Sequence, residues 1–391
     1  MKSEWKTIRA ADFIDFNPKA SIKKGVVATK IAMDKLLPFT KKIPASKPTE
    51  FLGGAKFING DTIMARITPC LENGKTAFVD ILNEGEVGFG STEFIVLRAK
   101  KDVSDPQFVY YLAISPAFRS VAIKSMVGSS GRQRVQQSVL NELKLLVPPL
   151  EEQERIGFLL AKLDDKIALN NAINDHLYEM VNAYYTHLFK NIECEMTTVG
   201  SYSKRVYSGG TPTTTNAAYW NGSFGWFSSG ETRNRFVIST EKTITQAGVD
   251  NSSTKLAKKH DIVMASAGQG FTRGQASMLL LDTYVNQSVI VIHAERNMLP
   301  YLFWNLANRY EELRAISDSS SIRGSLTTKM ISAFEIPHTD EASLQAFSDF
   351  AWSVIPKIEN NLLENERLVA IRDSLLPKLM SGEIDVSEVT T

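Results

Sequence analysis

Residues 147–190 read VPPLEEQERIGFLLAKLDDKIALNNAINDHLYEMVNAYYTHLFK, and two prolines at their start precede a long stretch of helical periodicity. The acidic residues that follow Pro149 favour the positive end of a helix. Beyond them, apolar residues advance by alternating steps of four and three, which places them on one seam of a coiled-coil-like helix. This first seam comprises Ile156, Leu160, Leu163, Ile167, Asn170, Asn174, Leu177, Val181, Tyr184 and Leu188.

A second seam with the same spacing follows 191 residues later (358 minus 167). It is interrupted only at Arg372, where the neighbouring Ile371 can take the seam position. Pro356 removes a backbone donor, so we expect the second helix to kink or split just before Lys357. The second seam comprises Phe347, Ala351, Val354, Ile358, Asn361, Asn365, Leu368, Arg372, Leu375 and Leu379.

Both seams carry asparagine at the same two positions. A buried amide weakens an apolar seam unless it finds a partner, but it also penalises slipped registers. We therefore interpret the asparagines as a register lock between two antiparallel helices, and the alternative is that they face solvent. The residues expected to pair the helices are Leu163, Ile167, Asn170, Asn174 and Leu177 on the first, and Val354, Ile358, Asn361, Asn365 and Leu368 on the second.

The segments that precede the two helices also repeat. GDTIMA at residues 60–65 returns as HDIVMA at 260–265, and FIVL at 94–97 returns as VIVI at 289–292. An offset of about 200 residues fits a duplicated domain with its connector and is too long for a solenoid repeat. The prediction is an α+β fold with two mixed α/β lobes in tandem, each followed by a long helix, and the two helices pair as an antiparallel coiled coil. The expected segments are lobe 1 at residues 1–146, a central helical spacer at 147–190, lobe 2 at 191–335 and a C-terminal helical spacer at 336–391.

Positive charge is concentrated in the lobes, although the chain as a whole carries a formal charge of only +1. Lobe 1 has 22 basic and 14 acidic residues, and lobe 2 has 14 basic and 12 acidic residues. The central spacer has 4 basic and 7 acidic residues, and the C-terminal spacer has 4 basic and 10 acidic residues. Basic lobes suit phosphates, and acidic helices suit a protein partner or are ordinary solvated faces.

Several classes of protein are excluded by what the sequence lacks. No apolar run is long enough to cross a bilayer, and no signal peptide is recognisable, so we expect a cytoplasmic protein without a membrane segment. Cys70 and Cys194 lie at unrelated places, so we expect free buried thiols and neither a disulfide framework nor a metal site. The motifs of amino methylation, phosphate loops and dinucleotide binding are also missing from the sequence.

The chain resembles the specificity subunits of type I restriction-modification systems. Residues 148–156 (PPLEEQERI) resemble the start of the central conserved helix of that family. Residues 61–75 and 88–97 in lobe 1, and residues 208–212 with the aromatic pairs at 219–220 and 226–227 in lobe 2, resemble the two target-recognition domains. Cys70 departs from the family pattern, where a small hydroxyl residue is expected, and residues 340–344 keep little of the Leu-Glu-Glu-Gln phrase.

The resemblance implies a non-catalytic subunit that recognises an asymmetric, two-part target in double-stranded DNA. Each lobe would recognise one half, and the paired helices would set the gap between the halves. The resemblance also implies two methyltransferase subunits and two restriction subunits as partners, and these would hold S-adenosylmethionine, ATP and Mg²⁺. The alternatives are a stand-alone DNA methyltransferase and a coiled-coil scaffold with no role on DNA.

The strongest candidates for DNA contact lie in a polar loop that occurs at the same place in both lobes. The loop combines glycines, hydroxyls that suit phosphates, and arginines that can bind guanine edges through two hydrogen bonds, so we expect it to contact DNA; the alternative is a plain solvated loop. The candidates are Ser129, Ser130, Arg132, Gln133 and Arg134 in lobe 1, and Ser320 and Arg323 in lobe 2.

Further candidates flank the matched Met-Ala strands or lie in a glycine-rich turn. The turn at residues 208–212 (SGGTP) would place backbone amides on phosphate or would simply be a tight turn. Surface arginines are also common in positions that face only solvent. These candidates are Arg66, Lys75, Gln269 and Arg273 beside the strands, and Ser208 and Thr211 in the turn.

Overall fold

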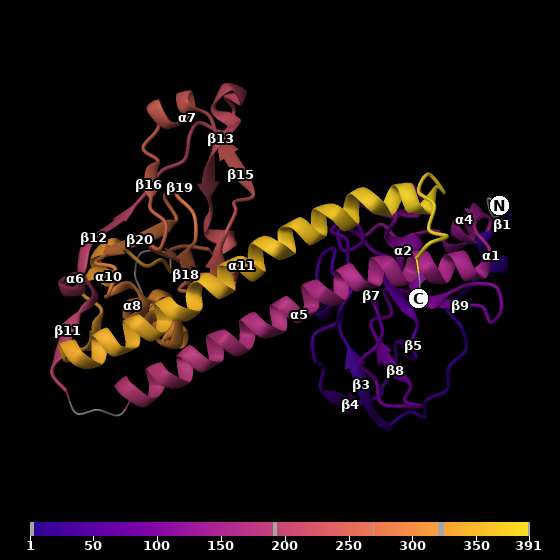
Figure 1. Ribbon diagram of the computed structural model, residues 1–391, viewed down its shortest axis with the longest axis horizontal. Coiled ribbons are helices and arrows are strands. Elements are labelled where there is room, and N and C mark those ends of the chain that lie inside the picture. Colours follow the sequence, from indigo (N-terminus) through magenta and orange to yellow (C-terminus); the bar gives the residue numbers. More distant parts are fainter. Residues whose placement is uncertain (1–3, 191–193, 269, 320–323, 390–391) are drawn as a thin grey trace. The chain divides into compact units, whose positions relative to one another are not determined.

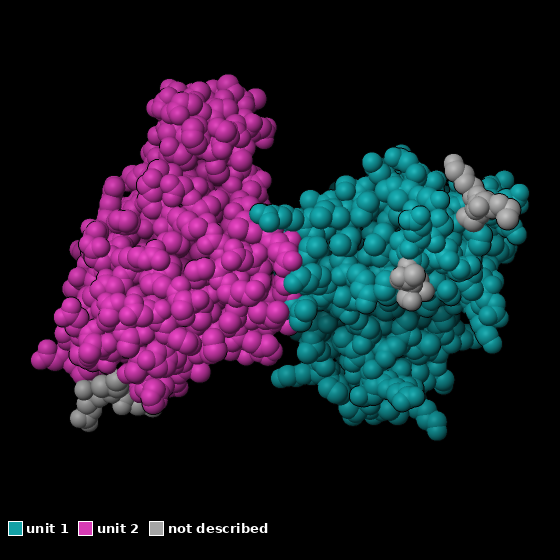
Figure 2. Space-filling view, in the orientation of Figure 1, with its two compact units in different colours: residues 1–169, 365–391 teal, residues 170–364 magenta. Residues whose placement is uncertain are grey.

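The chain folds into two compact units, each of which combines one lobe with parts of both long helices. The computed structural model describes residues 4–190, 194–268, 270–319 and 324–389. One unit consists of residues 1–169 and 365–391, and the other of residues 170–364 (Figure 2). The two helices, labelled in Figure 1, are α5 (Leu150–Phe189) and α11 (Glu341–Met380).

Lobe 1 is built on two four-stranded sheets. In spatial order the first is β2 (Ile14–Phe16), β9 (Phe94–Ala99), β6 (Thr62–Ala65) and β7 (Thr76–Phe78), and the second is β4 (Pro48–Glu50), β3 (Val27–Ile31), β8 (Gly88–Gly90) and β5 (Ala55–Phe57). The remaining elements are β1 (Lys6–Arg9), which pairs with β10 (Lys144–Val147), and helices α1 (Ala10–Phe13), α2 (Pro106–Ile114), α3 (Pro116–Lys124) and α4 (Gln137–Asn141). The side chains of Asp105 and Ser115 cap α2 and α3, and each helix has proline in its first turn, so the sequence itself fixes where these helices begin.

Lobe 2 repeats this plan with a five-stranded and a four-stranded sheet. In spatial order the first is β12 (Ser203–Ser208), β20 (Val289–Ala294), β17 (Ile262–Ala265), β18 (Ala276–Leu279) and β14 (Phe236–Val237), and the second is β15 (Lys242–Ile244), β13 (Trp220–Phe227), β19 (Thr283–Val285) and β16 (Lys255–Ala257). The remaining elements are β11 (Met196–Thr198), which pairs with β21 (Glu335–Pro337), and helices α6 (Val199–Tyr202), α7 (Gln246–Asp250), α8 (Leu299–Asn308), α9 (Tyr310–Ser319) and α10 (Thr328–Ser332).

The strand registers confirm that the two lobes are copies of one another. Thr62 of β6 lies opposite Leu97 of β9, and Ile262 of β17 lies opposite Ile292 of β20, so the central pairs match at offsets of 200 (262 minus 62) and 195 (292 minus 97). All four of these strands are largely apolar and buried, as expected for strands covered on both faces. The same offsets can therefore be used to compare individual positions of the two lobes.

In the first unit, the start of α5 packs against the end of α11. Ile156 and Leu160 of α5 share one apolar core with Leu376 and Leu379 of α11. Arg372 is buried, and Ile371 is 46% exposed, so the expectation that Ile371 replaces Arg372 in the seam is wrong. Arg372 forms an ion pair with Asp164 of α5, and this ion pair allows the arginine to occupy a buried position in the seam.

In the second unit the order is reversed, because the end of α5 packs against the start of α11. Val181 and Phe189 of α5 share a core with Phe347 and Val354 of α11. The opposite order in the two units means that the helices are antiparallel. None of the predicted pairing residues is exposed: Asn170, Val354, Ile358, Asn361 and Asn365 are buried, and Leu163, Ile167, Asn174, Leu177 and Leu368 are half-buried.

The second long helix is continuous through both of its prolines. The predicted split before Lys357 is therefore wrong. Pro356 lies on the exposed side of α11, where water can satisfy the backbone carbonyl that loses its donor. The helix therefore tolerates the proline.

The remaining expectations concern thiols, metals and membranes. Cys70 is half-buried and Cys194 is exposed, so both thiols are free but neither is buried as expected. Within the described residues, no cluster of His, Cys, Asp or Glu could hold a metal ion. Among the helices described, none is both long enough and apolar enough to cross a membrane.

Candidate nucleic-acid interface

The polar loop of lobe 1 lies between α3 and α4 and is attached to the end of strand β6. The Thr68 amide donates to the Gln133 carbonyl (3.0 Å), and the Val135 amide donates to the Arg66 carbonyl (2.9 Å). Gly128 and Gly131 have φ values of 136° and 75°, which suit glycine and allow the chain to turn sharply. The tip of the loop is exposed at Ser129, Ser130 and Arg132, and Gln133 is half-buried.

Two predicted arginines differ in how strongly the lobe holds them. Arg134 forms an ion pair with Glu93, with 2.6 Å between Nη2 and Oε1, and this hydrogen-bonded pair lowers the pKa of Glu93. No carboxylate within the described residues pairs with Arg132, and its side chain is exposed. The loop therefore presents one arginine in a fixed orientation and one that can adapt to a ligand.

Arg66 belongs to the same surface as the loop, whereas Lys75 does not. The Arg66 amide donates to the Glu93 carbonyl (2.9 Å), and the Arg66 carbonyl accepts from the Val135 amide of the loop. Arg66 therefore connects the loop to the turn before β9. The ammonium of Lys75 donates to the Met33 carbonyl (2.9 Å), and this contact holds a neighbouring segment of lobe 1. The structure thus gives Lys75 a role inside the lobe and does not bring it to the loop.

Lobe 2 holds its loop with the same backbone hydrogen bonds. The Leu326 amide donates to the Ser266 carbonyl (2.8 Å), and the Ser266 amide donates to the Ser288 carbonyl (2.8 Å). These bonds match those of Val135, Arg66 and Glu93 in lobe 1 position by position. Three predicted contacts of lobe 2, Gln269, Ser320 and Arg323, lie outside the described residues.

Arg273 is not the surface cation that the sequence suggested. Only 6% of this residue is exposed, and its guanidinium donates to the Gly324 carbonyl and forms an ion pair with Asp318. The arginine therefore fastens residue 318 and residue 324, on either side of the loop tip, to the sheet. Its expected direct contact with DNA is corrected to a supporting role, because a buried and paired guanidinium is not available to a ligand.

The glycine-rich turn of lobe 2 is explained by close packing. A Cβ atom on Gly209 would lie 1.9 Å from the Val285 carbonyl oxygen, and one on Gly210 would lie 2.1 Å from Ser253 Oγ. Thr211 donates a hydrogen bond to the Gln287 side chain, and Ser208 ends strand β12. These contacts favour the tight-turn interpretation, while Ser208 and Thr211 stay half-buried beside it.

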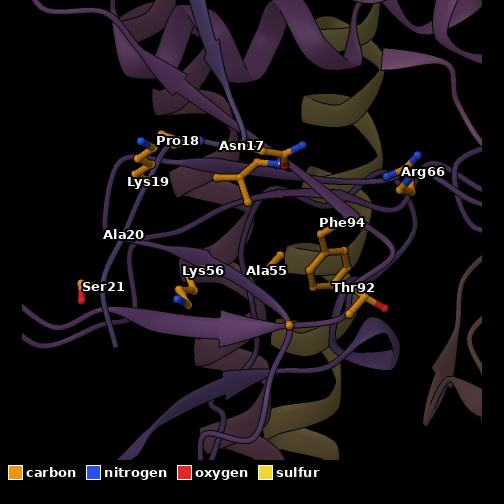
Figure 3. A pocket seen from close by; sticks show the side chains of 12 residues that line it. Asn17, Pro18, Lys19, Ala20, Ser21, Ala55, Lys56, Arg66, Thr92 and Phe94 are labelled. Carbon is orange, nitrogen blue, oxygen red and sulfur yellow. The ribbon is translucent and has the colours of Figure 1, made fainter. Parts of the chain in front are cut away.

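A pocket of about 720 Å³ lies next to Arg66 in lobe 1 (Figure 3). The pocket could not be predicted from the sequence, because its walls come from four separate segments. No motif unites them, and only Arg66 among them was a candidate. The lining residues are Asn17, Pro18, Lys19, Ala20, Ser21, Gly54, Ala55, Lys56, Arg66, Thr92, Phe94 and Val96.

Residues 2–179 match the family model described as the type I restriction modification DNA specificity domain. Over these residues the chain matches the type I restriction-modification specificity subunits, as the resemblance implied, and relatives named as specificity subunits extend the similarity over most of its length. The description of that model assigns DNA specificity to the matched domain, and the relatives are named as specificity subunits of type I restriction enzymes.

Individual relatives agree with this assignment. The chain is 22% identical to the type I restriction enzyme HindI specificity subunit of Haemophilus influenzae, over 83% of this chain and 86% of the relative. It is 38% identical to the EcoAI specificity subunit of Escherichia coli, over 27% of this chain and 18% of that relative. The crystal structure of the type I system S subunit from M. genitalium has the same fold, with a TM-score of 0.58, 15% identity and coverage of 97% of this chain and 96% of that chain.

Proposed function

We propose that the chain recognises an asymmetric DNA target in two parts, with one lobe on each half. The observation that carries this proposal is the shared attachment of a polar loop to the sheet in both lobes. The attachment is the same, but the side chains differ: Arg66 and Glu93 in lobe 1 occupy the positions of Ser266 and Ser288 in lobe 2. The two lobes therefore share one backbone arrangement but carry different side-chain donors and acceptors, which allows them to recognise two different base sequences.

The paired helices would set the gap between the two half-sites. Each helix has 40 residues, and both contribute to the core of each compact unit. Seven residues inserted into each helix at matched positions, after Leu169 and before Asn365, would lengthen the pair by about 10 Å, because an α-helix rises 1.5 Å per residue. We expect the gap to lengthen by roughly three base pairs, with both half-sites unchanged. An unchanged gap in a folded variant would exclude the helices as the ruler.

The partners would be two methyltransferase subunits and, in the full complex, two restriction subunits, all in the cytoplasm. S-adenosylmethionine, ATP and Mg²⁺ would bind in these partners. The excess of acidic residues in the two helical spacers supports a docking role for the helices. Native mass spectrometry with excess methyltransferase subunit should give a complex of two such subunits with one chain. A one-to-one limit would contradict this stoichiometry.

Mapping of methylated adenines in a host that carries the chain and its methyltransferase partner tests the central proposal. We expect two short base sequences separated by a gap of constant length. Selection of duplexes from a random library by the purified complex should return the same two sequences. A scaffold without a role on DNA would enrich no sequence in either experiment. Deletion of the gene for this chain is the control, and methylation of that target should disappear.

A further inference from the structure

The pocket beside Arg66 is a basic site whose walls carry no carboxylate. Its lining includes Lys19, Lys56 and Arg66, together with the polar side chains of Asn17, Ser21 and Thr92. Figure 3 shows Lys56 and Arg66 at the wall, with Phe94 between them. None of the three cations has a carboxylate at ion-pair distance among the described residues.

Two of these cations are held in place by contacts that leave their charge available. The ammonium of Lys56 lies 5.3 Å from the centroid of the Phe51 ring, which supports the side chain without neutralising it. Among the described residues, the guanidinium of Arg66 makes one long hydrogen bond, from Nη2 to the Val135 carbonyl (3.5 Å), which leaves its Nη1 donors unused. A guanidinium that retains unused donors is prepared to bind an anion.

The lining favours a phosphate over a base. Phe94 is the aromatic residue of the pocket, and it is only 2% exposed, so its face is not available for stacking on a base. Hydroxyl, amide, ammonium and guanidinium groups are the donors that proteins direct at the DNA backbone. The pocket also adjoins the polar loop, because Arg66 is hydrogen-bonded to Val135 at the end of that loop.

Lobe 2 differs at the matching positions. Lys56 lies opposite Phe89, and Leu256 lies opposite Tyr284, so the strand registers equate Lys56 with Leu256. The backbone hydrogen bonds equate Arg66 with Ser266. The pair of available cations at these two positions is therefore a feature of lobe 1.

We propose that this pocket binds a backbone phosphate of the half-site recognised by lobe 1, with Lys56 and Arg66 as its main donors. The proposal rests on the proposed DNA recognition and adds where lobe 1 holds the DNA strand. A phosphate contact carries no base information, but it releases counterions, so its loss changes the salt dependence of binding.

The test is a transplant of the lobe 2 residues, Lys56→Leu with Arg66→Ser, in the full chain bound to its methyltransferase partner. The probe is a duplex that carries the mapped target, with binding measured over a series of KCl concentrations. We expect weaker binding to all duplexes, unchanged base preference, and a salt slope shallower by about 1, since the loss of one phosphate contact removes about one unit. A charge-preserving variant, Lys56→Arg with Arg66→Lys, should keep the wild-type slope and shows whether an effect follows charge.

The matched control removes the same charge elsewhere in lobe 1. Lys101 and Lys144 are exposed and do not line the pocket, so Lys101→Leu with Lys144→Ser should change the slope less. An unchanged slope in the folded transplant, or a loss confined to one base position, would overturn the phosphate site. If the wild-type complex selects no sequence at all, the proposed function fails instead, so the two failures are distinguishable.

Discussion

Asp164 of α5 and Arg372 of α11 form a buried ion pair inside the first compact unit. Arg372 Nη1 lies 2.6 Å from Asp164 Oδ1, and the two side chains are 5% and 4% exposed. Tyr111 donates to the other carboxylate oxygen at 2.6 Å. The 191-residue repeat equates these helix positions with Val181 and Ile355, which are buried in the apolar core of the second unit. At these matched helix positions, the first unit has a buried ion pair and the second has apolar side chains.

Removal of one partner of this ion pair should destabilise the protein strongly. Arg372→Ala leaves a buried carboxylate without its counterion, which typically costs about 3 to 5 kcal/mol. Replacement of the whole network, Lys41→Met and Tyr111→Phe with Asp164→Ile and Arg372→Val, should restore stability to within about 1 kcal/mol of wild type or exceed it, because Lys41 also depends on the Asp164 carboxylate. Urea unfolding measures both changes. The control is the exposed Arg367→Ala, and an equal loss there would show that burial is not the cause.

The asparagine pair between the helices should behave as a coupled unit. Asn361 Nδ2 donates to Asn174 Oδ1 at 2.8 Å, and Asn361 is buried. Asn361→Leu leaves the Asn174 amide without this partner and should cost about 1 to 3 kcal/mol. Asn174→Leu in addition should recover most of the loss. A double-mutant cycle from urea unfolding gives the coupling energy, with the exposed Asn360→Leu as control. Additive losses would show that the two amides do not act as a pair.

Lys41 should make the stability of the protein depend on alkaline pH. It is 3% exposed, and burial lowers its pKa below the ordinary value of 10.5, although Asp164 nearby offsets part of the effect. Because the unfolded chain holds this proton to higher pH than the folded chain, the free energy of unfolding should rise as pH increases towards 10.5.

The comparison with Lys41→Met isolates this contribution. The free energy of unfolding of wild type minus that of the variant should increase from roughly pH 8 to pH 10, because only the wild type loses this proton. Lys47→Met, which replaces an exposed lysine, is the control for the loss of a lysine at the surface. If the difference in the free energy of unfolding between wild type and Lys41→Met does not change with pH, the ammonium of Lys41 is not destabilised by burial.

Arg132 should affect only one half of the DNA target. If its exposed guanidinium binds a base edge, Arg132→Ala should cost about 1 to 3 kcal/mol of discrimination at one position of the lobe 1 half-site. If it binds phosphate, affinity should fall evenly over all sequences. Selection from a random duplex library distinguishes the two results, with Lys124→Ala as a control for charge in the same lobe. Wild-type affinity and preference would make the loop tip an ordinary solvated turn.

The regular parts of the fold could be predicted because their signals are periodic. The seam spacing identified both long helices, and the matched strands identified the duplicated lobe, since burial on one face or both leaves a repeating pattern. The same pattern misassigned Arg372, because periodicity records where a side chain points and not whether a charge has a buried partner. Asp164, next to Leu163 in the first seam, was the available signal.

The candidate site was only partly predictable, for a different physical reason. The loop of lobe 1 was recognisable because glycines, hydroxyls and arginines are adjacent in sequence. The pocket was not, since Lys19, Lys56 and Arg66 are brought together by strand pairing between distant segments. Arg273 was misjudged because arginine is usually exposed, and its burial depends on the Asp318 side chain 45 residues away.

The division of the two helices between the compact units has a consequence for synthesis on the ribosome. Leu376, Leu379 and Val386 complete the apolar core that contains Ile156 and Leu160. These three residues are translated only after the whole of lobe 2. The first unit therefore cannot complete its core until α11 has been synthesised. The apolar residues of the α5 seam stay without their α11 partners until more than two hundred further residues have been translated (376 minus 160). Synthesis thus starts with the first unit, but the core of that unit is completed only when the end of the chain has been made.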